Sequence, residues 1–328
     1  MRARNRKSRI TATGDFRKIL KKQKYFLVGE HSAVRICTWT KKSLVDGGKC
    51  YKEQFYGIKS RECCQMSPFI SCANKCVHCW RPIELDIKLS DKINEPKEII
   101  EGCIKAQRKL LSGLGGYEKT NKKKFKEAQE PSQFAISLIG EPTQYPELGE
   151  LIKELRKQKK TSFLVTNGLF PEKIKELQEK NALPTQLYVS MLYPNEELFR
   201  KITNNKAKDS WRHYNETLSI LKDLKTRTVI RITLIKELNT DNELIERYAG
   251  LIKKASPLFI EVKSFMHVGF SKERLSYKQM PLHKEIKEFS EKLLKFLPEY
   301  KFLDEKTESR VVLLGKDRER MEIEKEEI

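Results

Sequence analysis

Apolar runs of strand length alternate with helical patterns through most of the chain after residue 95. Strands are predicted over residues 134–139, 162–168, 186–191, 228–235, 258–265 and 310–314. Apolar residues recur at helical spacing between them, which predicts helices near residues 96–115, 147–158, 171–180, 210–225, 241–254 and 282–297. Because parallel strands need long crossover connections, this alternation favours an α/β fold in which helices cover a parallel sheet.

Three cysteines lie close together in the segment SCANKCVHCWRP, residues 71–82. Cys72, Cys76 and Cys79 have the spacing C-x-x-x-C-x-x-C. Three thiolates on one short loop can bind three irons of a cubic iron–sulfur cluster, which leaves the fourth iron open to a small molecule. The alternative is a zinc site, but zinc usually takes four ligands from two C-x-x-C pairs, and no second pair is present. A disulfide is disfavoured because the rest of the sequence is typical of an intracellular protein.

This cysteine loop resembles that of the radical S-adenosylmethionine (SAM) superfamily. The resemblance spans about residues 66–270 and implies an incomplete TIM-type barrel of about six βα units, with the chemistry at the carboxyl ends of the strands. It also implies that Cys72, Cys76 and Cys79 hold a [4Fe–4S] cluster whose open iron chelates SAM, and that reduction yields a 5′-deoxyadenosyl radical. His78 stands where the superfamily usually has Phe or Tyr, so it would place a flat ring near the adenine.

Charge and composition narrow the choice of partner and compartment. With 328 residues the chain could form one large α/β domain or two smaller ones. A formal net charge of +21 predicts attraction to a polyanion, most simply nucleic acid, although lysine-rich solvated faces would give the same composition. The first residues, MRARNRKSRI, lack the apolar stretch of a signal peptide, and no apolar run is long enough to span a bilayer. We therefore expect a cytoplasmic protein without membrane association.

A second set of cysteines precedes the first along the chain. Cys37, Cys50 and Cys63 are spaced 13 residues apart and could hold a second cluster, again one ligand short. Cys64 is an alternative third ligand, and three unrelated buried cysteines would explain the pattern without any metal. Cys103 falls on the apolar face of a predicted helix, where a packed thiol is expected.

The sequence around both cysteine sets resembles the 4-demethylwyosine synthase family. The matching stretches are CTWTKKSLVDGGKCYKEQFYGIKSRECCQMSP, AISLIGEPTQYPEL, FLVTNG, PTQLYVS and FIEVKSFMHVGFSKERL, within about residues 15–315. The resemblance implies a tRNA-modifying enzyme whose substrates are pyruvate and N1-methylguanosine at position 37 of tRNA-Phe, in the anticodon loop. The adenosyl radical would remove hydrogen from the N1-methyl group. The carbon radical would add to pyruvate, which loses formate as 4-demethylwyosine forms.

The resemblance also bears on the electron donor and on the division of the chain. The flavodoxin-like reductase domain of eukaryotic relatives has no counterpart in this sequence, so we expect a separate donor such as flavodoxin or ferredoxin. Residues 1–24 are expected to form a basic arm with a short helix, and residues 25–70 a cluster-binding extension. Residues 71–315 would form the partial barrel, and the charged residues 316–328 a mobile tail.

Pyruvate is expected to bind near the second cysteine set, because the resemblance implies that the open iron of a second [4Fe–4S] cluster positions it. The lysine proposed for the family lies two residues after the second upstream cysteine, which here is Lys52 in CYKEQFYG. A lysine can activate a keto acid as a Schiff base once an apolar or positive environment lowers its pKa. Lys52 is therefore the candidate catalytic residue, with Lys41 and Lys42 as weaker candidates. Any one lysine in this chain could equally be a solvated surface group.

Residues that follow the predicted strands are candidates for binding SAM. In the superfamily a Gly-Glu motif after one strand holds the SAM amino group, and the matching segment here is GEPT, with Gly140, Glu141 and Thr143. Further candidates at strand ends are Asn167, Ser190 and Arg231. Arg231 could face the SAM carboxylate, because an arginine inside a barrel needs an anionic partner. Ordinary strand-to-helix turns would explain the GEPT and TNG segments without a ligand.

Basic and aromatic residues are candidates for contact with RNA. The basic candidates are Arg2, Arg4, Arg6, Lys7, Lys122, Lys123, Lys124 and Lys126, which could neutralise phosphates. Trp80 and Arg81 could stack on or steer an unstacked base beside the cluster. Lys263, Ser264 and His267 could line the substrate side of the barrel. Two other functions stay open at this point: a radical SAM activase that acts on a protein, and a non-catalytic iron–sulfur protein that binds RNA.

Overall fold

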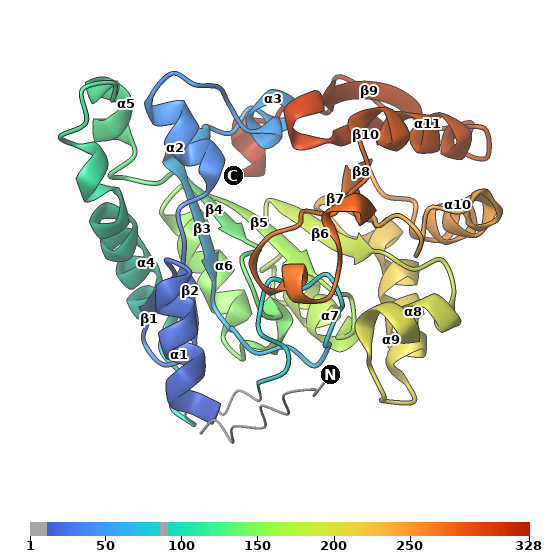
Figure 1. Ribbon diagram of the computed structural model, residues 1–328, viewed down its shortest axis with the longest axis horizontal. Coiled ribbons are helices and arrows are strands. Elements are labelled where there is room, and N and C mark those ends of the chain that lie inside the picture. The colour runs from blue at the N-terminus through green and yellow to red at the C-terminus, as the bar shows by residue number, and fades with distance from the viewer. Residues whose placement is uncertain (1–11, 86–88, 90) are drawn as a thin grey trace, which may run out of the picture.

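The computed structural model describes residues 12–85, 89 and 91–328, and ten strands are present within these residues. The strands are β1 Phe26–Val28, β2 Ser32–Val34, β3 Cys63–Ser67, β4 Gln133–Ile136, β5 Thr161–Thr166, β6 Gln186–Met191, β7 Arg227–Leu234, β8 Phe259–Ser264, β9 Lys301–Lys306 and β10 Val311–Gly315. They form one sheet in the order β1-β2-β3-β4-β5-β6-β7-β8-β10-β9. Strands β3 to β8 pair in parallel, and the pairs at both edges are antiparallel. The six parallel strands confirm the incomplete (β/α)6 barrel (Figure 1).

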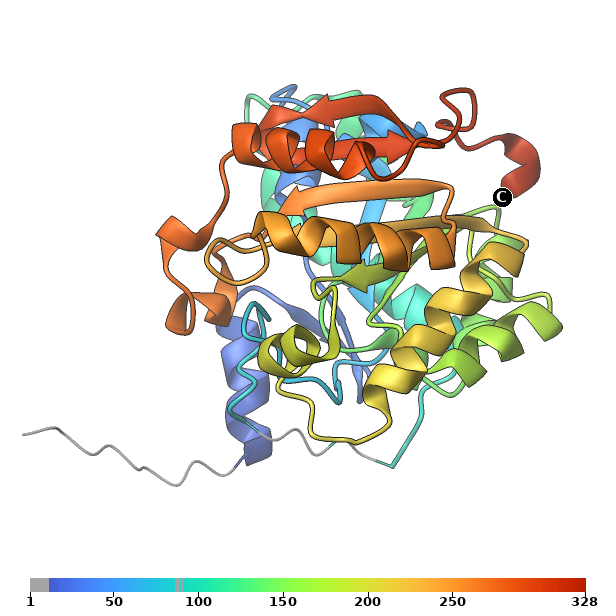
Figure 2. The ribbon, with the colours of Figure 1, turned by 90° about the vertical axis from the view of Figure 1, so that its right-hand side faces the viewer.

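Helices cover the outer side of the parallel strands. The α-helices are α1 Ala12–Lys22, α2 Thr38–Leu44, α3 Tyr51–Tyr56, α4 Pro96–Leu111, α5 Lys122–Glu127, α6 Leu148–Lys157, α7 Pro171–Glu179, α8 Glu196–Thr203, α9 Ser210–Ile220, α10 Ile245–Ala255 and α11 His283–Leu294. Helices α9, α10 and α11 lie next to one another across this side (Figure 2). Their apolar stripes face the strands, so the main core lies between the sheet and the helices. In the described part of the chain, no helix is both long and apolar enough to cross a membrane.

The predicted strands and helices after residue 95 are all present, with bounds that differ by a few residues. Helix α1 confirms the short helix expected in the basic arm, whereas Arg2, Arg4, Arg6 and Lys7 lie outside the described residues. Strand β3 was not predicted, although it is the first of the six parallel strands and pairs with β4. The expected start of the barrel at residue 71 therefore falls after its first strand.

The expectation of a mobile tail over residues 316–328 differs from the structure. Met321 is buried in an apolar cluster that also contains Tyr56. The guanidinium of Arg227, which is 2% exposed, donates to the Arg320 carbonyl at 2.6 Å and pairs with Glu327 at 2.9 Å. A buried arginine needs acceptors on all sides, and the tail supplies them, so this charged segment is held against the barrel.

Candidate active site

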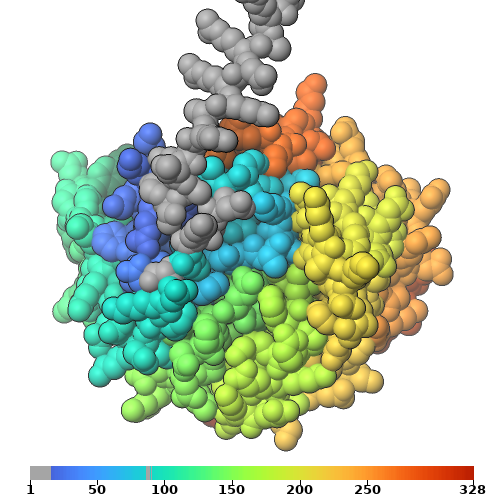
Figure 3. Space-filling view, turned by 90° about the horizontal axis from the view of Figure 1, so that it is seen from below, coloured from blue at the N-terminus to red at the C-terminus, as the bar shows by residue number. Residues whose placement is uncertain are grey.

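The loop with Cys72, Cys76 and Cys79 follows the carboxyl end of β3. Backbone hydrogen bonds join it to the end of α8, from the Lys75 amide to the Thr203 carbonyl and from the Val77 amide to the Ile202 carbonyl, both at 2.9 Å. On the face shown in Figure 3, the segment after β3 lies between α1 (blue) and the α8–α9 region (yellow). The structure thus places the first cysteine set where the barrel predicts the chemistry, at the carboxyl ends of the strands.

The chemistry of the donor set fits an iron–sulfur cluster. All eight cysteines of the chain are free thiols, so the disulfide alternative fails. Burial raises the pKa of Cys76, and the neighbouring thiols of Cys72 and Cys79 raise it further. Within the described residues, no group of three or more His, Cys, Asp or Glu side chains is arranged to hold one metal ion. A cubic cluster distributes its thiolates over several irons and does not gather them on one ion.

Two arginines hold the cysteine loop in place. Arg81 is 5% exposed and donates to the carbonyls of Ile70, at 3.2 Å, and Asn74, at 3.1 Å. Arg274 donates to the carbonyls of Val77, Cys79 and Arg81. Because Arg81 is committed to the backbone of its own loop, its position does not support the predicted contact with an unstacked base. Arg274 lies almost 200 residues later in the chain, and reasoning on the cysteine loop alone missed it.

The GEPT segment packs directly on the cysteine loop. Gly140 has φ of +77°, and a Cβ atom there would lie 2.0 Å from the Phe69 carbonyl oxygen, so only glycine fits. The amide of Glu141 donates to the Ser71 carbonyl at 2.7 Å. The buried Glu141 carboxylate accepts from the Thr143 and Thr166 hydroxyls, both at 2.6 Å. These bonds join the loops after β4 and β5 to the cysteine loop.

The Glu141 carboxylate also reaches Asn167, and Asn167 reaches a cysteine. The Asn167 amide donates to Glu141 at 2.8 Å, and the Asn167 side-chain Nδ2 lies 3.6 Å from the Cys72 Sγ. Burial raises the pKa of Glu141, although its hydrogen bonds oppose the shift. Ser190 is half-buried in β6, and its carbonyl accepts from the Tyr214 hydroxyl at 3.3 Å. The structure therefore brings Gly140, Glu141 and Asn167 to the first cysteine set.

His78 contributes a ring that could contact a ligand. Its Nδ1 atom is buried and has no hydrogen-bond partner in the described part of the chain. Burial, together with the charge of Arg274, lowers the pKa of His78 to about 4. A neutral ring with an unpaired nitrogen fits an adenine-bearing ligand beside Cys79.

The second cysteine set comes together at the opposite end of β3. Cys37 precedes α2, Cys50 precedes α3 and Cys63 begins β3. Burial raises the pKa of Cys50 to about 11, with the Cys37 thiol as the next cause. Burial raises the pKa of Cys63 as well, and Lys52 opposes the shift while Cys37 and Cys50 add to it. The Cys37 thiol thus raises the pKa of both Cys50 and Cys63, as expected of neighbouring groups.

The alternation of side chains along β3 indicates whether Cys63 or Cys64 is the third member of the second cysteine set. Successive side chains of a strand point to opposite faces, so only one of the two can face Cys37 and Cys50. Cys64 is fully buried, and a hydrogen bond with Cys103 raises its pKa together with burial. Cys103 is the packed thiol that was expected on α4. The candidate third ligand is therefore Cys63.

Lys52 lies in the barrel interior beside this second set. It is 8% exposed, and its Nζ lies 5.0 Å from the Phe163 ring centroid and 5.1 Å from the Tyr188 ring centroid. Burial lowers the pKa of Lys52, and the nearby charge of Arg231 lowers it further. The apolar and positive environment expected for a reactive lysine is thus present.

Arg231 forms an ion pair with a carboxylate of the protein itself, Glu261. Its Nε lies 2.9 Å from the Glu261 Oε2 atom, and Glu261 is fully buried. The hydroxyls of Tyr51 and Tyr56 also donate to Glu261, at 3.2 and 2.8 Å. The predicted contact of Arg231 with the SAM carboxylate is not needed to explain its burial, because Glu261 supplies the anionic partner.

Lys263 adds a third positive group to this interior space. Its Nζ lies 5.0 Å from the Tyr51 ring centroid and donates to the Ser309 carbonyl at 2.7 Å. Burial, followed by the charge of Arg231, lowers the pKa of Lys263 to about 8. We call the part of the barrel interior where Lys52, Arg231, Lys263 and Glu261 interact the inner chamber. Three basic side chains against one carboxylate give it an excess of positive charge, which favours an anionic ligand.

Family models and known relatives match almost all of the chain. Residues 66–249 match the radical SAM superfamily, and residues 254–316 match the wyosine base formation family. The S-adenosyl-L-methionine-dependent tRNA 4-demethylwyosine synthase of Pyrococcus abyssi is 47% identical over 91% of this chain and 88% of its own length. That of Methanocaldococcus jannaschii is 41% identical over 90% of this chain and 94% of its own length. The chain belongs to the 4-demethylwyosine synthase family.

Solved structures agree with this membership. A structure of TYW1 with a lysine–pyruvate adduct bound superimposes with a TM-score of 0.83 at 37% identity and covers 95% of this chain and 98% of its own. Archaeal TYW1 superimposes with a TM-score of 0.76 at 35% identity. The chain is therefore a radical SAM enzyme of the wyosine pathway, and radical SAM enzymes use SAM with a [4Fe–4S] cluster.

Several of the remaining candidates are engaged with other parts of the protein. Lys122 donates to the Gly115 carbonyl at 2.8 Å, and Lys124 pairs with Asp46 at 2.5 Å. The Nε2 atom of His267 bonds to the Leu275 carbonyl at 2.9 Å, as in a satisfied structural histidine. The Ser264 hydroxyl donates to the Phe265 carbonyl at 2.9 Å. Of the three residues expected on the substrate side, only Lys263 lies in the inner chamber.

Replacing Glu261 with glutamine is expected to destabilise the protein by about 3–5 kcal/mol, because it leaves Arg231 without its buried counter-charge. Burial alone would raise the pKa of Glu261, but Arg231 and Lys52 outweigh burial and lower it, so the carboxylate is charged. The free energy of unfolding would be measured by urea denaturation of the cluster-free protein. The exposed Glu308→Gln is the control and should change it by less than about 0.5 kcal/mol. A loss below about 1 kcal/mol for Glu261→Gln would contradict a charged, compensating role.

Proposed function

We propose that this chain converts N1-methylguanosine at position 37 of tRNA-Phe, together with pyruvate, to 4-demethylwyosine. The observation that carries the proposal is the position of Lys52, which is buried in the inner chamber, two residues after Cys50, with its amine over the rings of Phe163 and Tyr188. The TYW1 structure described above carries a lysine–pyruvate adduct, and Lys52 is the residue here that suits such an adduct.

Lys52 suits the adduct better than Lys263. The Lys263 amine already donates to the Ser309 carbonyl at 2.7 Å. The Lys52 amine instead lies over the rings of Phe163 and Tyr188, which offer no carbonyl or carboxylate oxygen as a hydrogen-bond acceptor. Condensation of that amine with the pyruvate carbonyl forms an imine and releases one water molecule. The keto acid is thereby activated and held in one position.

The charge of the inner chamber supports a carboxylate ligand. Lys263 and Arg231 remain positive groups beside the proposed imine, and Glu261 offsets only one of them. A pyruvate carboxylate near Lys263 would therefore be attracted electrostatically.

We further propose that the chain holds two [4Fe–4S] clusters. One is held by Cys72, Cys76 and Cys79; with SAM it would supply the radical that removes hydrogen from the N1-methyl group. Gly140, Glu141, Thr143, Asn167, Ser190 and His78 are the proposed SAM-side residues. The auxiliary cluster is held by Cys37, Cys50 and Cys63, and its open iron would take pyruvate as a ligand. The convergence of three thiols beside Lys52 supports this second assignment.

The proposed partners follow from the same reaction. The tRNA anticodon loop presents the modified guanosine, and the net charge of +21 favours binding of a polyanion. A separate donor such as flavodoxin or ferredoxin supplies the electron. We place this reaction in the cytoplasm, together with its tRNA.

The test is anaerobic incubation of the cluster-loaded protein with N1-methylguanosine tRNA, SAM, pyruvate and dithionite. The nucleosides are then analysed by mass spectrometry, with pyruvate carrying ¹³C at its second and third carbons. We expect a tricyclic nucleoside that contains both labelled carbons. A product without them, or SAM cleavage with an unmodified nucleoside, would reject the proposed reaction.

A further inference from the structure

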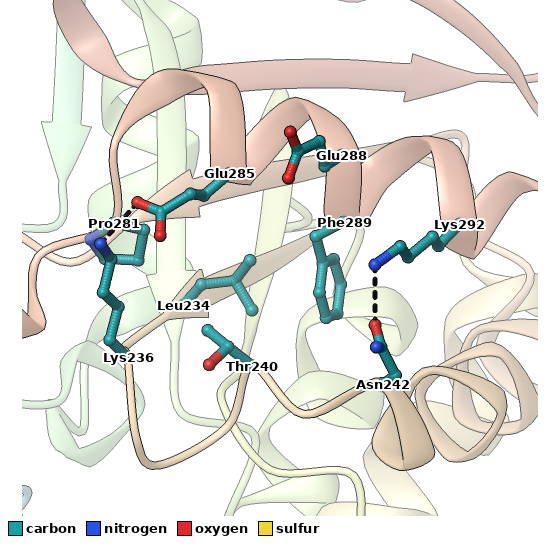
Figure 4. Close-up of a pocket in the computed structure, with 9 residues that line it drawn as sticks. All are labelled: Leu234, Lys236, Thr240, Asn242, Pro281, Glu285, Glu288, Phe289 and Lys292. Atoms are coloured by element: carbon teal, nitrogen blue, oxygen red, sulfur yellow. Dashed lines mark hydrogen bonds and ion pairs between the residues drawn. The ribbon is translucent and has the colours of Figure 1, made fainter.

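A basic groove lies between the N-terminal elements α1, β1 and α2 and the end of α4. The volume of this groove is about 880 Å³. The pocket shown in Figure 4 is smaller, with a volume of about 200 Å³. Its basic lining residues are Arg17, Lys21, Lys24, Arg35, Lys41 and Lys109. None of the described residues that line it is an aspartate or a glutamate.

Much of this positive charge is not neutralised by the protein itself. Lys21, Lys24 and Lys41 are exposed and form no ion pair within the described residues. Arg17 pairs with Glu30 at 3.1 Å, and Lys109 lies 5.6 Å from the Phe26 ring centroid. At least three lysines are thus available for an external anion.

The pocket in Figure 4 differs from the basic groove in its balance of charge. There Lys236 pairs with Glu285 at 2.7 Å, and Lys292 donates to the Asn242 side chain at 2.9 Å. Glu288 lines the same pocket, so its charges are balanced from within. A polyanion would gain little there, whereas the basic groove offers several uncompensated charges.

The basic groove also runs beside both cysteine sets. Tyr25 lines it and packs in one apolar cluster with Ile70, two residues before Cys72. Arg35 lies 5.1 Å from the Tyr25 ring centroid. Thr38 lines the groove as well and directly follows Cys37. A strand bound along this groove would therefore pass close to both proposed clusters.

We propose that the basic groove is the docking surface for the phosphodiester backbone of the tRNA substrate. This inference rests on the proposed function, which makes a tRNA anticodon loop the substrate. Lys21, Lys24 and Lys41 bind phosphates without reading the sequence, and they hold the loop so that one unstacked nucleotide can enter the barrel beside Cys79.

The test is the affinity of the cluster-loaded protein for N1-methylguanosine tRNA, measured by fluorescence anisotropy over a range of salt concentrations. The triple variant Lys21→Ala, Lys24→Ala, Lys41→Ala is expected to raise Kd by about tenfold or more at moderate salt. The slope of log Kd against log salt should fall by about 2, since each phosphate contact in a single strand contributes about 0.7. Arginine at the same three positions should preserve both values.

A matched control removes the same charge elsewhere. Lys284, Lys292 and Lys295 belong to α11 and its end, on the opposite side of the molecule from α1 in Figure 1. Their triple alanine variant should change Kd by less than about twofold if location matters. Equal weakening by both triple variants, or unchanged binding by the groove variant, would overturn the docking surface alone. Absence of tRNA binding by the parent protein would instead reject the proposed function. SAM cleavage without tRNA should be the same in all variants.

Discussion

Replacing Lys52 with alanine is expected to lower formation of the tricyclic nucleoside by about a thousandfold or more, the scale seen when a covalent catalytic residue is removed. SAM cleavage that is not coupled to product should continue, because Lys52 lies with the second cysteine set and not with Cys72, Cys76 and Cys79. Nucleoside mass analysis and quantification of 5′-deoxyadenosine would measure the two activities in one reaction.

Lys52→Arg separates covalent chemistry from electrostatics. Arginine keeps the positive charge near Phe163 and Tyr188 but cannot form an imine with pyruvate. Borohydride reduction with pyruvate should add the mass of one reduced pyruvate to the peptide that contains Lys52 in the parent protein, and should add nothing in Lys52→Arg. Product formation by Lys52→Arg at the parent rate would show that only charge is required.

Lys42→Ala is the matched control for this experiment. Lys42 is an exposed lysine on α2, 4.8 Å from the Trp39 ring centroid, and it was a weaker candidate for the same role. It should keep product formation and borohydride trapping close to those of the parent. A comparable loss in Lys42→Ala would mean that the effect does not depend on the inner chamber.

The barrel could be predicted from the sequence because most of its strands are continuous apolar runs between amphipathic helices. Strand β3 could not, since its residues CCQMS include two thiols and a glutamine, and its extended conformation comes from pairing with β2 and β4. The packing of the tail was missed for a similar reason. Its charged composition indicates solvent exposure, whereas the buried Arg227 that holds it lies on β7.

The cysteine sets and Lys52 could be located from short segments, but the partner of Arg231 could not. Glu261 lies on the next strand, and the parallel register pairs Arg231 directly with Glu261. A signal was present, because each is a charged residue within a strand predicted to be buried. Pairing two such residues across neighbouring strands would have given the ion pair, and with it the counter-charge of the inner chamber.

Cys63→Ala should reduce the iron content of the anaerobically reconstituted protein from about eight to about four atoms per chain, because it removes one of three ligands of the proposed auxiliary [4Fe–4S] cluster. The neighbouring Cys64→Ala should leave about eight. The two residues are adjacent in β3, yet Cys63 interacts with Cys37 and Cys50 whereas Cys64 packs against Cys103 on α4. Iron and acid-labile sulfide would be measured together.

The adjacent pair makes this comparison specific. Both substitutions delete one sulfur atom from the same strand, and Cys64 is the more buried of the two, so a general loss of folding would affect Cys64→Ala at least as much. Cys72→Ala provides the opposite case, because it should remove the SAM-side cluster and leave about four irons on Cys37, Cys50 and Cys63. Iron loss in Cys64→Ala, with eight irons kept in Cys63→Ala, would assign the third auxiliary ligand to Cys64. Four irons in the parent protein would mean that the upstream cysteines hold no cluster, and that pyruvate is bound by Lys52 and the charges of the inner chamber alone.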